Sequence, residues 1–288
     1  MQYLFAWRYF RSKKSTSAIN IIAWVSVTAI AVGAAALIVI LSVFNGFEDL
    51  VKGLYTDFYA DMRVLPAQGK RINLDDRTLY TIQSIEGVAE VSKVIEEKAL
   101  LANGDYQSIV LVKGVDSVFT RTNHINKHIV RGNYETGDLQ NPGIIMGAGI
   151  ENAVGADVTK GGFPLTLYTP NKGAGFDAVE GMFAFNVTAK GVFAVQQEFD
   201  NKFIFTNISF LRYMLSMDSN QVSSVEIKIN GSPEKIKTKL QAALGKNFVV
   251  ETRYEQNKNL YAVMQMEKWV IYGILSLILI WSYLMTCF

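Results

Sequence analysis

Cysteine and histidine are nearly absent from this chain, and their scarcity excludes several kinds of site. The only cysteine is Cys287, so no disulfide can form within the chain. The two histidines, His124 and His128, lie four residues apart, as zinc ligands on one helix face do. Because no third or fourth ligand is evident, we interpret both histidines as solvated surface residues and Cys287 as a small buried hydrophobe.

Motifs for phosphate binding and for catalysis are also missing. No G-x-x-x-x-G-K-[ST] segment occurs, and the nearest glycine cluster, GAGIENAVG at 147–155, lacks the Lys-Ser or Lys-Thr ending. Two histidines and one cysteine in an apolar tail cannot supply a Ser-His-Asp or Cys-His set. We therefore predict no cofactor, no metal and no catalytic residue, so that the chain is not an enzyme on its own.

An excess of charge of one sign is absent as well. The chain has 28 Lys and Arg residues against 26 Asp and Glu residues, which gives a formal net charge of +2. No basic stripe is available to neutralise the phosphates of a nucleic acid. We expect no nucleic-acid partner.

What the sequence does contain is two long uncharged apolar runs. The first, at 19–44, would form a helix about 39 Å long, more than the ~30 Å of bilayer hydrocarbon. The second, at 269–288, is just long enough to span. We predict a transmembrane helix over each run. The first is expected to remain uncleaved, because it is about twice as long as a signal-peptide core.

The segment before the first run fixes the expected orientation. Residues 1–18 carry four basic side chains and no acidic one, with apolar residues at helical spacing. This pattern predicts an amphipathic segment in the cytoplasmic interface of the lipid bilayer, and the positive-inside rule then places 45–268 on the far side. The predicted interfacial anchors are Trp7, Arg8, Arg11, Lys13, Lys14 and Trp269.

The region between the runs mixes helix and strand patterns. Helical spacing continues through 45–59 and recurs at 254–268, which predicts two stalk helices. Patterns of β-α-β type occupy 60–115 and 222–253, and the glycine-rich stretch 116–221 predicts an inserted β-rich part. The expected fold is therefore an α+β membrane protein, with two transmembrane helices flanking a large aqueous domain.

A glycine-rich loop is predicted at 170–184, between two strands of the inserted part. We expect it to be mobile and to expose Phe176, Met182 and Phe183. Exposed apolar residues on such a loop can form a docking element, and an ordinary long hairpin loop is the alternative.

Several segments resemble one family of membrane proteins. FAWRYFRSKKSTSAINIIAWVSV at 5–27 and LSVFNGFE at 41–48 resemble the start of lipoprotein-releasing permeases of the LolC/LolE type, within the wider MacB-like and FtsX-like permease superfamily. MEKWVIYGILSLILI at 266–280 is similar to the beginning of that family's second span. KGVDSVF at 113–119 and IIMGAGIENAVGADV at 144–158 resemble two of its periplasmic landmarks.

The resemblance implies a multi-pass inner-membrane permease subunit of an ABC transporter, with its N-terminus in the cytoplasm and a MacB-like periplasmic core. The implied partners are a cytoplasmic ATPase subunit, a second permease subunit of the same or a different chain, lipoprotein substrates and a periplasmic lipoprotein carrier. The loop at 170–184 falls where the family has a hook that recruits this carrier. The family continues with two further spans, so we expect a chain truncated after its second span.

Two other functions stay open. One is an FtsX-like or MacB-like permease with another substrate or a regulatory role. The other is a two-span membrane sensor, which would need a signalling coiled coil after the second run.

Overall fold

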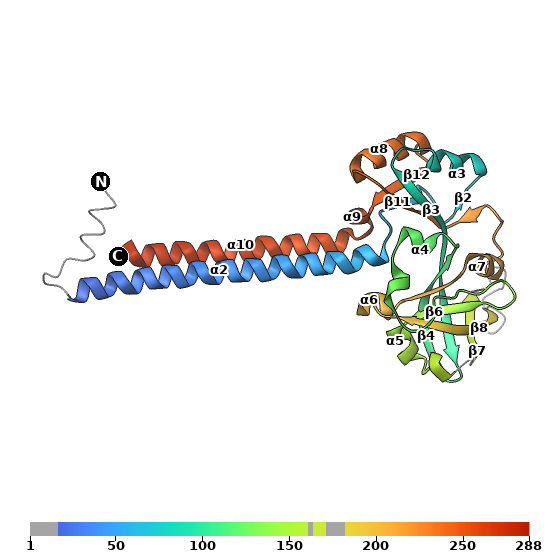
Figure 1. The fold of residues 1–288 in the computed structure, drawn as a ribbon, viewed down its shortest axis with the longest axis horizontal. Helices are drawn as coiled ribbons and strands as arrows, with labels where there is room; N and C mark the ends of the chain where they lie inside the picture. The colour runs from blue at the N-terminus through green and yellow to red at the C-terminus, as the bar shows by residue number, and fades with distance from the viewer. Residues whose placement is uncertain (1–16, 161–163, 171–181, 288) are drawn as a thin grey trace. The chain divides into compact units, whose positions relative to one another are not determined.

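The computed structural model describes residues 17–160, 164–170 and 182–287 and divides the chain into two compact units (Figure 1). The helical unit comprises Met1–Val51 and Lys258–Phe288, and the β-rich unit comprises Lys52–Asn257. Five of the six predicted anchors, and Phe176 of the predicted loop, lie outside the described residues.

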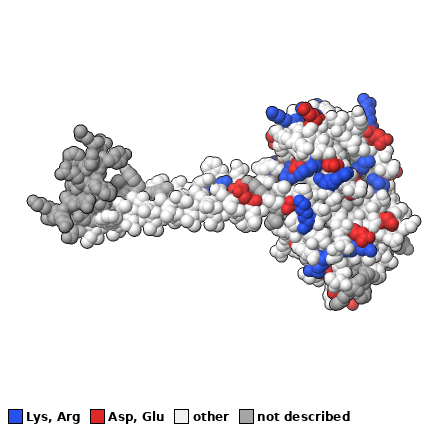
Figure 2. All heavy atoms as spheres, viewed as in Figure 1, with Lys and Arg blue, Asp and Glu red and all other residues white. Residues whose placement is uncertain are grey.

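The helical unit consists of two long helices that lie side by side. Helix α2 (Ser17–Phe58) begins in this unit, and α10 (Lys258–Cys287) lies within it. Lys268 of α10 forms an ion pair with Glu48 of α2, with 3.0 Å between the charged atoms. The helix α2 continues through 45–58 without a break, as the helical spacing predicts. Most apolar side chains of the unit are exposed, and its surface in Figure 2 carries few charges.

One helix among the described residues is long and apolar enough to cross a membrane, over Ile30–Phe58. The criterion is length and composition alone, and a signal sequence or the core helix of a soluble protein would also meet it. The predicted second span at 269–288 therefore remains a prediction.

In the β-rich unit, four antiparallel strands form a sheet backed by two helices. The strand order is β12-β1-β11-β3, and α3 and α8 pack against one face. These elements are β1 (Met62–Pro66), α3 (Asp76–Gln83), β3 (Val88–Asn103), β11 (Ser224–Ile229), α8 (Pro233–Leu244) and β12 (Phe248–Thr252). Helix α3 begins directly after Asp75, whose carboxylate caps it by accepting a hydrogen bond from the Thr78 N–H at 2.9 Å.

Six strands of the same unit close into a small barrel. The order around the ring is β3-β4-β9-β6-β8-β7, and β7 closes it by pairing Leu167 with Leu101 of β3. The further elements are β4 (Tyr106–Val115), β6 (Gly143–Gly147), α5 (Ala148–Ala153), β7 (Pro164–Pro170), β8 (Met182–Phe193), β9 (Phe203–Asn207) and α7 (Ile208–Met214). Buried apolar side chains from all six strands, α5 and α7 fill its core.

The remaining elements of this unit are short. They are β2 (Ile72–Asn73), α4 (Phe119–Thr122), η1 (Ile125–His128), β5 (Ile129–Gly132), η2 (Val158–Lys160), α6 (Gln197–Asp200), β10 (Gln221–Val222) and α9 (Arg253–Gln256). Strand β5 extends the sheet beyond β8, and β10 pairs only with β2.

The strand β3 belongs both to the helix-backed sheet and to the barrel. The sequence predicts instead that the inserted β-rich part begins only at residue 116. The first half of β3 pairs with β11 in the helix-backed sheet, and its second half pairs with β7 in the barrel. Strands β3 and β4 form a hairpin that turns at Gly104, whose φ is +57°. Because β3 is 16 residues long, this hairpin supplies two of the six barrel strands.

Candidate functional site

The last turn of α2 is seated in the β-rich unit by an aromatic cluster. The ring of Phe58 stacks on Phe199 of α6, with centroids 4.0 Å apart and planes 7° from parallel. It also lies 4.8 Å from the ring of Phe203 and 6.0 Å from that of Phe205. Phe58 is almost completely buried, so the helix end is part of the core of this unit.

Polar contacts surround the same turn. Tyr55 Oη donates a hydrogen bond to Glu198 Oε2 at 2.6 Å, and His128 Nε2 lies 2.9 Å from Asp57 Oδ2. The backbone N–H of His124 donates to the carbonyl of Asp57 at 2.9 Å. These contacts tie α6 and η1 to the end of α2.

The two histidines therefore differ from the sequence interpretation of solvated surface residues. His128 is half-buried against Asp57. His124 precedes the short helix η1, so the two histidines do not share a helix face. Burial lowers the pKa of His124, and the nearby Lys127 and Lys228 lower it further. Among the described residues, no group of three or more potential metal ligands comes together.

A cluster of charged groups holds the chain where it leaves α2 and where it approaches α10. The Asp61 carboxylate accepts hydrogen bonds from Arg253 and from the N–H of Ile229, and it lies 3.3 Å from Lys228 Nζ. Arg253 also donates to the hydroxyl of Thr56 at 3.3 Å. We call Thr56, Asp61, Lys228 and Arg253 the helix clasp, because they join the segments that lead to both long helices.

The sequence predicts one continuous stalk helix over 254–268. The structure instead has two helices here, with a break between them. Thr252 and Glu255 form a capping box that starts the short helix α9. Asn257, whose φ and ψ of −121° and 34° are not helical, ends α9, and α10 begins at Lys258. The break follows directly after the helix clasp.

An ion network lies beneath Phe58. Lys113 Nζ lies 2.6 Å from Glu226 Oε1 and 3.3 Å from Glu96 Oε1, and the lysine side chain is 2% exposed. The ammonium also lies over the rings of Phe58 and Phe119, 5.7 and 5.4 Å from their centroids. Burial alone would lower the pKa of Lys113, but Glu226 and Glu96 outweigh it and raise the pKa.

This network connects the two layers of the β-rich unit. Lys113 comes from β4 of the barrel and Glu226 from β11 of the helix-backed sheet, with β3 between them. The sequence interpretation missed it, although a lone lysine in the otherwise apolar stretch VLVKGV was a usable signal.

Two of the three predicted docking residues, Met182 and Phe183, lie at one end of the β7–β8 pair. Met182 and Phe183 are 49% and 44% exposed, but they belong to β8 rather than to a loop, since Met182 pairs with Pro170 of β7. The ring of Phe183 lies 6.4 Å from that of Phe185, which lies 6.2 Å from the exposed Tyr213. We call Phe183, Phe185 and Tyr213 the tip aromatic cluster.

Trp269, the one described anchor, is exposed on α10, next to the Lys268–Glu48 ion pair. An exposed indole at this position is compatible with an interfacial role but does not test it.

Comparison with known proteins identifies similar chains. The family model of the MacB-like periplasmic core domain matches residues 23–243 of this chain. The lipoprotein-releasing system transmembrane protein LolC of Neisseria meningitidis serogroup B is 26% identical, over 94% of this chain and 65% of its own length. The corresponding LolE protein of Haemophilus influenzae is 24% identical, over 79% of this chain and 55% of its own length. The chain thus spans less than two thirds of these relatives.

Two solved structures are also similar to this chain, with low scores. The periplasmic region of MacB from Actinobacillus actinomycetemcomitans is 11% identical, covers 69% of this chain and 92% of its own, and gives a TM-score of 0.47. The extracellular domain of YknZ, a noncanonic ABC-type transporter from Gram-positive bacteria, is also 11% identical. It covers 66% of this chain and 99% of its own, with a TM-score of 0.46. The match to the family model, and not these scores, decides the assignment.

Proposed function

The chain belongs to the family of the MacB-like periplasmic core domain, and on this basis we propose that it is a permease subunit that releases lipoproteins from the inner membrane. The predicted resemblance to permeases of the LolC/LolE type is confirmed. The observation that carries the proposal is the similarity to a lipoprotein-releasing transmembrane protein along 94% of the chain. The substrates would be acylated lipoproteins, passed on to a periplasmic carrier.

The proposed subunit does not hydrolyse ATP itself. A separate cytoplasmic ATPase would supply the energy, and a second permease subunit would complete the membrane part. The N-terminus would lie in the cytoplasm, two spans at 19–44 and 269–288 would cross the inner membrane, and the β-rich unit would lie in the periplasm.

The end of α2 supports a mechanical role for the first helix. The helix is unbroken from Ser17 to Phe58, and its last turn is fixed by Phe58 and by the helix clasp. A displacement of this last turn would therefore be passed to β9 and α6, whose residues contact Phe58 and Tyr55.

The tip aromatic cluster supports docking of the carrier beside β8. Met182 and Phe183 present apolar surface to solvent, and Phe176 would add to it. The alternative is an ordinary hairpin without a partner. Replacing Phe183 by alanine should lower capture of the carrier without lowering the amount of folded chain, whereas unchanged capture would favour the alternative.

Affinity purification of the full chain from membranes tests the central proposal. We expect it to recover an ATPase that carries a Walker motif. Recovery of none, while the gene for the partner is expressed, would contradict the proposal. If the ATPase is recovered but depletion of the chain leaves lipoprotein release unchanged, a FtsX-like regulatory permease becomes the better assignment. A two-span sensor predicts neither recovery of the ATPase nor an effect of depletion on lipoprotein release.

A further inference from the structure

The strand β3 has an unpaired stretch in the middle of one edge. On one side it pairs with β4 continuously from Val94 to Asn103. On the other side it pairs with β11 up to Val94 and with β7 only from Leu100 onwards. Between these two partners, no strand in the described part of the chain pairs with residues 95–99 on that edge. We call these five residues the β3 gap.

Each neighbouring strand stops at the gap for an identifiable reason. Before β11, the chain turns away at Ser223, because Gln221 and Val222 pair with β2 instead of β3. On the other side, the register of β7 would place Pro170 opposite Lys98. A proline has no backbone N–H to donate, so the β7 ladder cannot extend over Lys98. The gap is therefore built into the sequence at both ends.

The backbone groups in the gap have only substitute partners. The Ser223 hydroxyl serves Glu96 twice, accepting from its N–H at 3.0 Å and donating to its carbonyl at 3.4 Å. By strand alternation, Lys98 presents its N–H and C=O to the same edge. Among the described residues, that N–H reaches only the carboxylate of the adjacent Glu97, at 3.3 Å. An exposed strand edge of this kind is a template for another strand.

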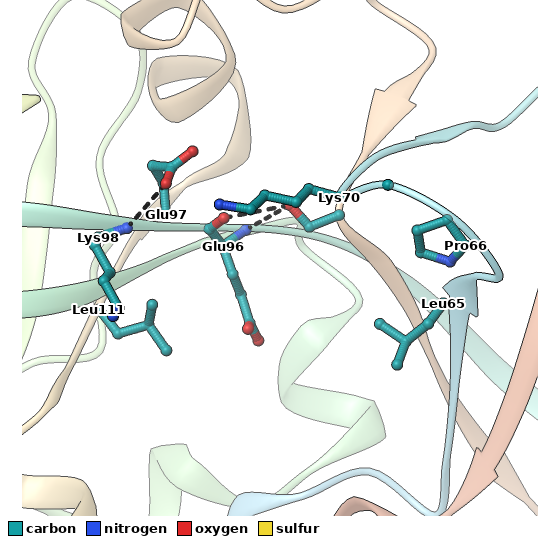
Figure 3. Close-up of a pocket in the computed structure, with 9 residues that line it drawn as sticks. Leu65, Pro66, Lys70, Glu96, Glu97, Lys98 and Leu111 are labelled. Atoms are coloured by element: carbon teal, nitrogen blue, oxygen red, sulfur yellow. Dashed lines mark hydrogen bonds between the residues drawn. The ribbon is translucent and has the colours of Figure 1, made fainter. Parts of the chain in front are cut away.

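A cleft of about 410 Å³ opens along this edge (Figure 3). Its apolar wall consists of Leu65, Pro66 and Leu111, which are all half-buried. Lys70 and Lys98 are exposed at its rim. The cleft is thus wide enough for more than water and has both an apolar wall and cationic groups.

The charge of the cleft favours an acidic occupant. Of the two lining carboxylates, that of Glu96 points away from Lys70 and pairs with the buried Lys113. Among the described residues that line the cleft, two are exposed lysines, Lys70 and Lys98, and, apart from Glu96, one carries a carboxylate, Glu97. The excess of positive charge at the rim would attract a carboxylate on the occupant.

We propose that the β3 gap binds an extended peptide segment of another protein, which carries an acidic side chain and adds to β3 as a short strand. Five residues of strand are about 16 Å long, so the gap fits a segment of three to five residues. Main-chain hydrogen bonds to Lys98 and Glu96 would give affinity, and the lysines would select the acidic residue. This inference goes beyond lipoprotein release and does not depend on it.

A blocked pentapeptide, acetyl-Thr-Val-Asp-Val-Thr-amide, can probe the gap of the purified full-length chain in nanodiscs. We expect saturable binding by calorimetry. Only alternate N–H groups of an added strand face β3, so N-methylation of residues 2 and 4 should differ from N-methylation of residues 1, 3 and 5. One set should weaken binding at least tenfold and the other should have little effect. Equal effects of the two sets, or no binding at millimolar peptide, would overturn the proposal.

Two sets of variants separate recognition from folding. The double variant Lys70→Glu/Lys98→Glu should weaken binding at least tenfold, whereas Lys235→Glu/Lys246→Glu, at two exposed lysines away from the cleft, should not. Ser223→Ala frees the backbone of Glu96 for the peptide and should strengthen binding several-fold. If Ser223→Ala weakens binding, or both lysine pairs act alike, the occupant does not add to β3.

Discussion

The helical unit and the β-rich unit use apolar side chains in opposite ways. In the helical unit, isoleucine, valine and leucine side chains such as that of Ile38 point outward, and few are buried. In the β-rich unit, the same residue types fill two cores, one in the barrel and one beneath the helix-backed sheet. An apolar exterior is stable only in an apolar surrounding, so the proposed location of the helical unit in the membrane predicts this difference between the two units.

The largest expected effect concerns Phe58, an apolar residue of α2 that belongs to the β-rich unit. Phe58→Ala removes a ring that contacts Phe199, Phe203 and Phe205, so we expect a loss toward the upper end of about 3–5 kcal/mol in the unfolding free energy of this unit. Hydrogen exchange of β9 and α6 in the full chain measures it. The four tryptophans all lie in the helical unit, so their fluorescence would not report this change.

The control is Phe183→Ala, which truncates an exposed ring of the β-rich unit. We expect it to change the unfolding free energy by less than about 1 kcal/mol. If Phe58→Ala and Phe183→Ala lower the unfolding free energy by the same amount, Phe58 is not part of the core.

Lys113→Met tests the charged pair of Lys113 and Glu226, which the β-rich unit buries between its layers. The substitution keeps the volume of the side chain but leaves Glu226 buried without its cation. We expect a loss of about 3 kcal/mol in unfolding free energy, the lower end of the range for a broken buried pair. Urea titration with pulse proteolysis gives the value.

The double variant Lys113→Met/Glu226→Gln sharpens this prediction. Removing both charges should restore at least half of the lost stability, since no uncompensated buried carboxylate then remains at β11. Additive losses would show that Lys113 acts through packing against Phe58 and Phe119 rather than through charge.

Two equally exposed isoleucines allow the two units to be compared with one substitution. Ile38 in the helical unit is 69% exposed and Ile109 in the β-rich unit is 74% exposed. Ile38→Lys should disfavour membrane insertion by about 2.5 kcal/mol, because it places an ammonium in lipid away from the middle of the predicted span. Ile109→Lys should change stability by less than about 0.5 kcal/mol. The chain remaining in carbonate-washed membranes measures the difference, and equal amounts for both would contradict the comparison.

The smallest expected effect is at Glu255, which caps α9. Burial would raise its pKa, but hydrogen bonds from Lys237 and Thr252 outweigh burial and lower it from 4.5. A lowered folded-state pKa gives stability that is present above the unfolded-state pKa and is lost as the pH falls through the folded-state pKa. Since Glu255 is partly exposed, we expect Glu255→Gln to cost less than about 1 kcal/mol at pH 7.

Urea midpoints of Glu255→Gln and of the unmodified chain, compared from pH 7 downwards, measure this contribution. The difference should shrink below pH 4.5. Glu135→Gln, at an exposed glutamate of the same unit, is the matched control variant. A difference that grows on acidification would contradict the capping role.

Local patterns in the sequence predicted much of the fold. The uncharged run at 19–44 predicts α2, and Asn103-Gly104-Asp105 predicts the β3–β4 hairpin, because each depends on neighbouring residues alone. The alternation of apolar and polar residues similarly predicts β11. In each case the determining residues are close together in the sequence.

The features that were missed depend on residues far apart in the sequence. Closure of the barrel pairs Leu101 with Leu167, and the ion network joins Lys113 to Glu226. Strand β8 begins at Met182, inside the predicted loop at 170–184, although MFAFNV already alternates. His128 could not be paired with Asp57 from spacing alone, since the two are 71 residues apart. Such contacts arise from topology, which local periodicity does not encode.

The most direct test of the proposed membrane location of the helical unit is maleimide labelling of single cysteines in a Cys287→Ser background. Ile38→Cys and Ile109→Cys place thiols at positions of similar exposure, one in each unit. In cells with a permeabilised outer membrane, a membrane-impermeant maleimide should label the Ile109→Cys chain and should leave the Ile38→Cys chain unlabelled until detergent is added. Equal labelling of both chains before detergent would show that water surrounds both units and would contradict the proposed location.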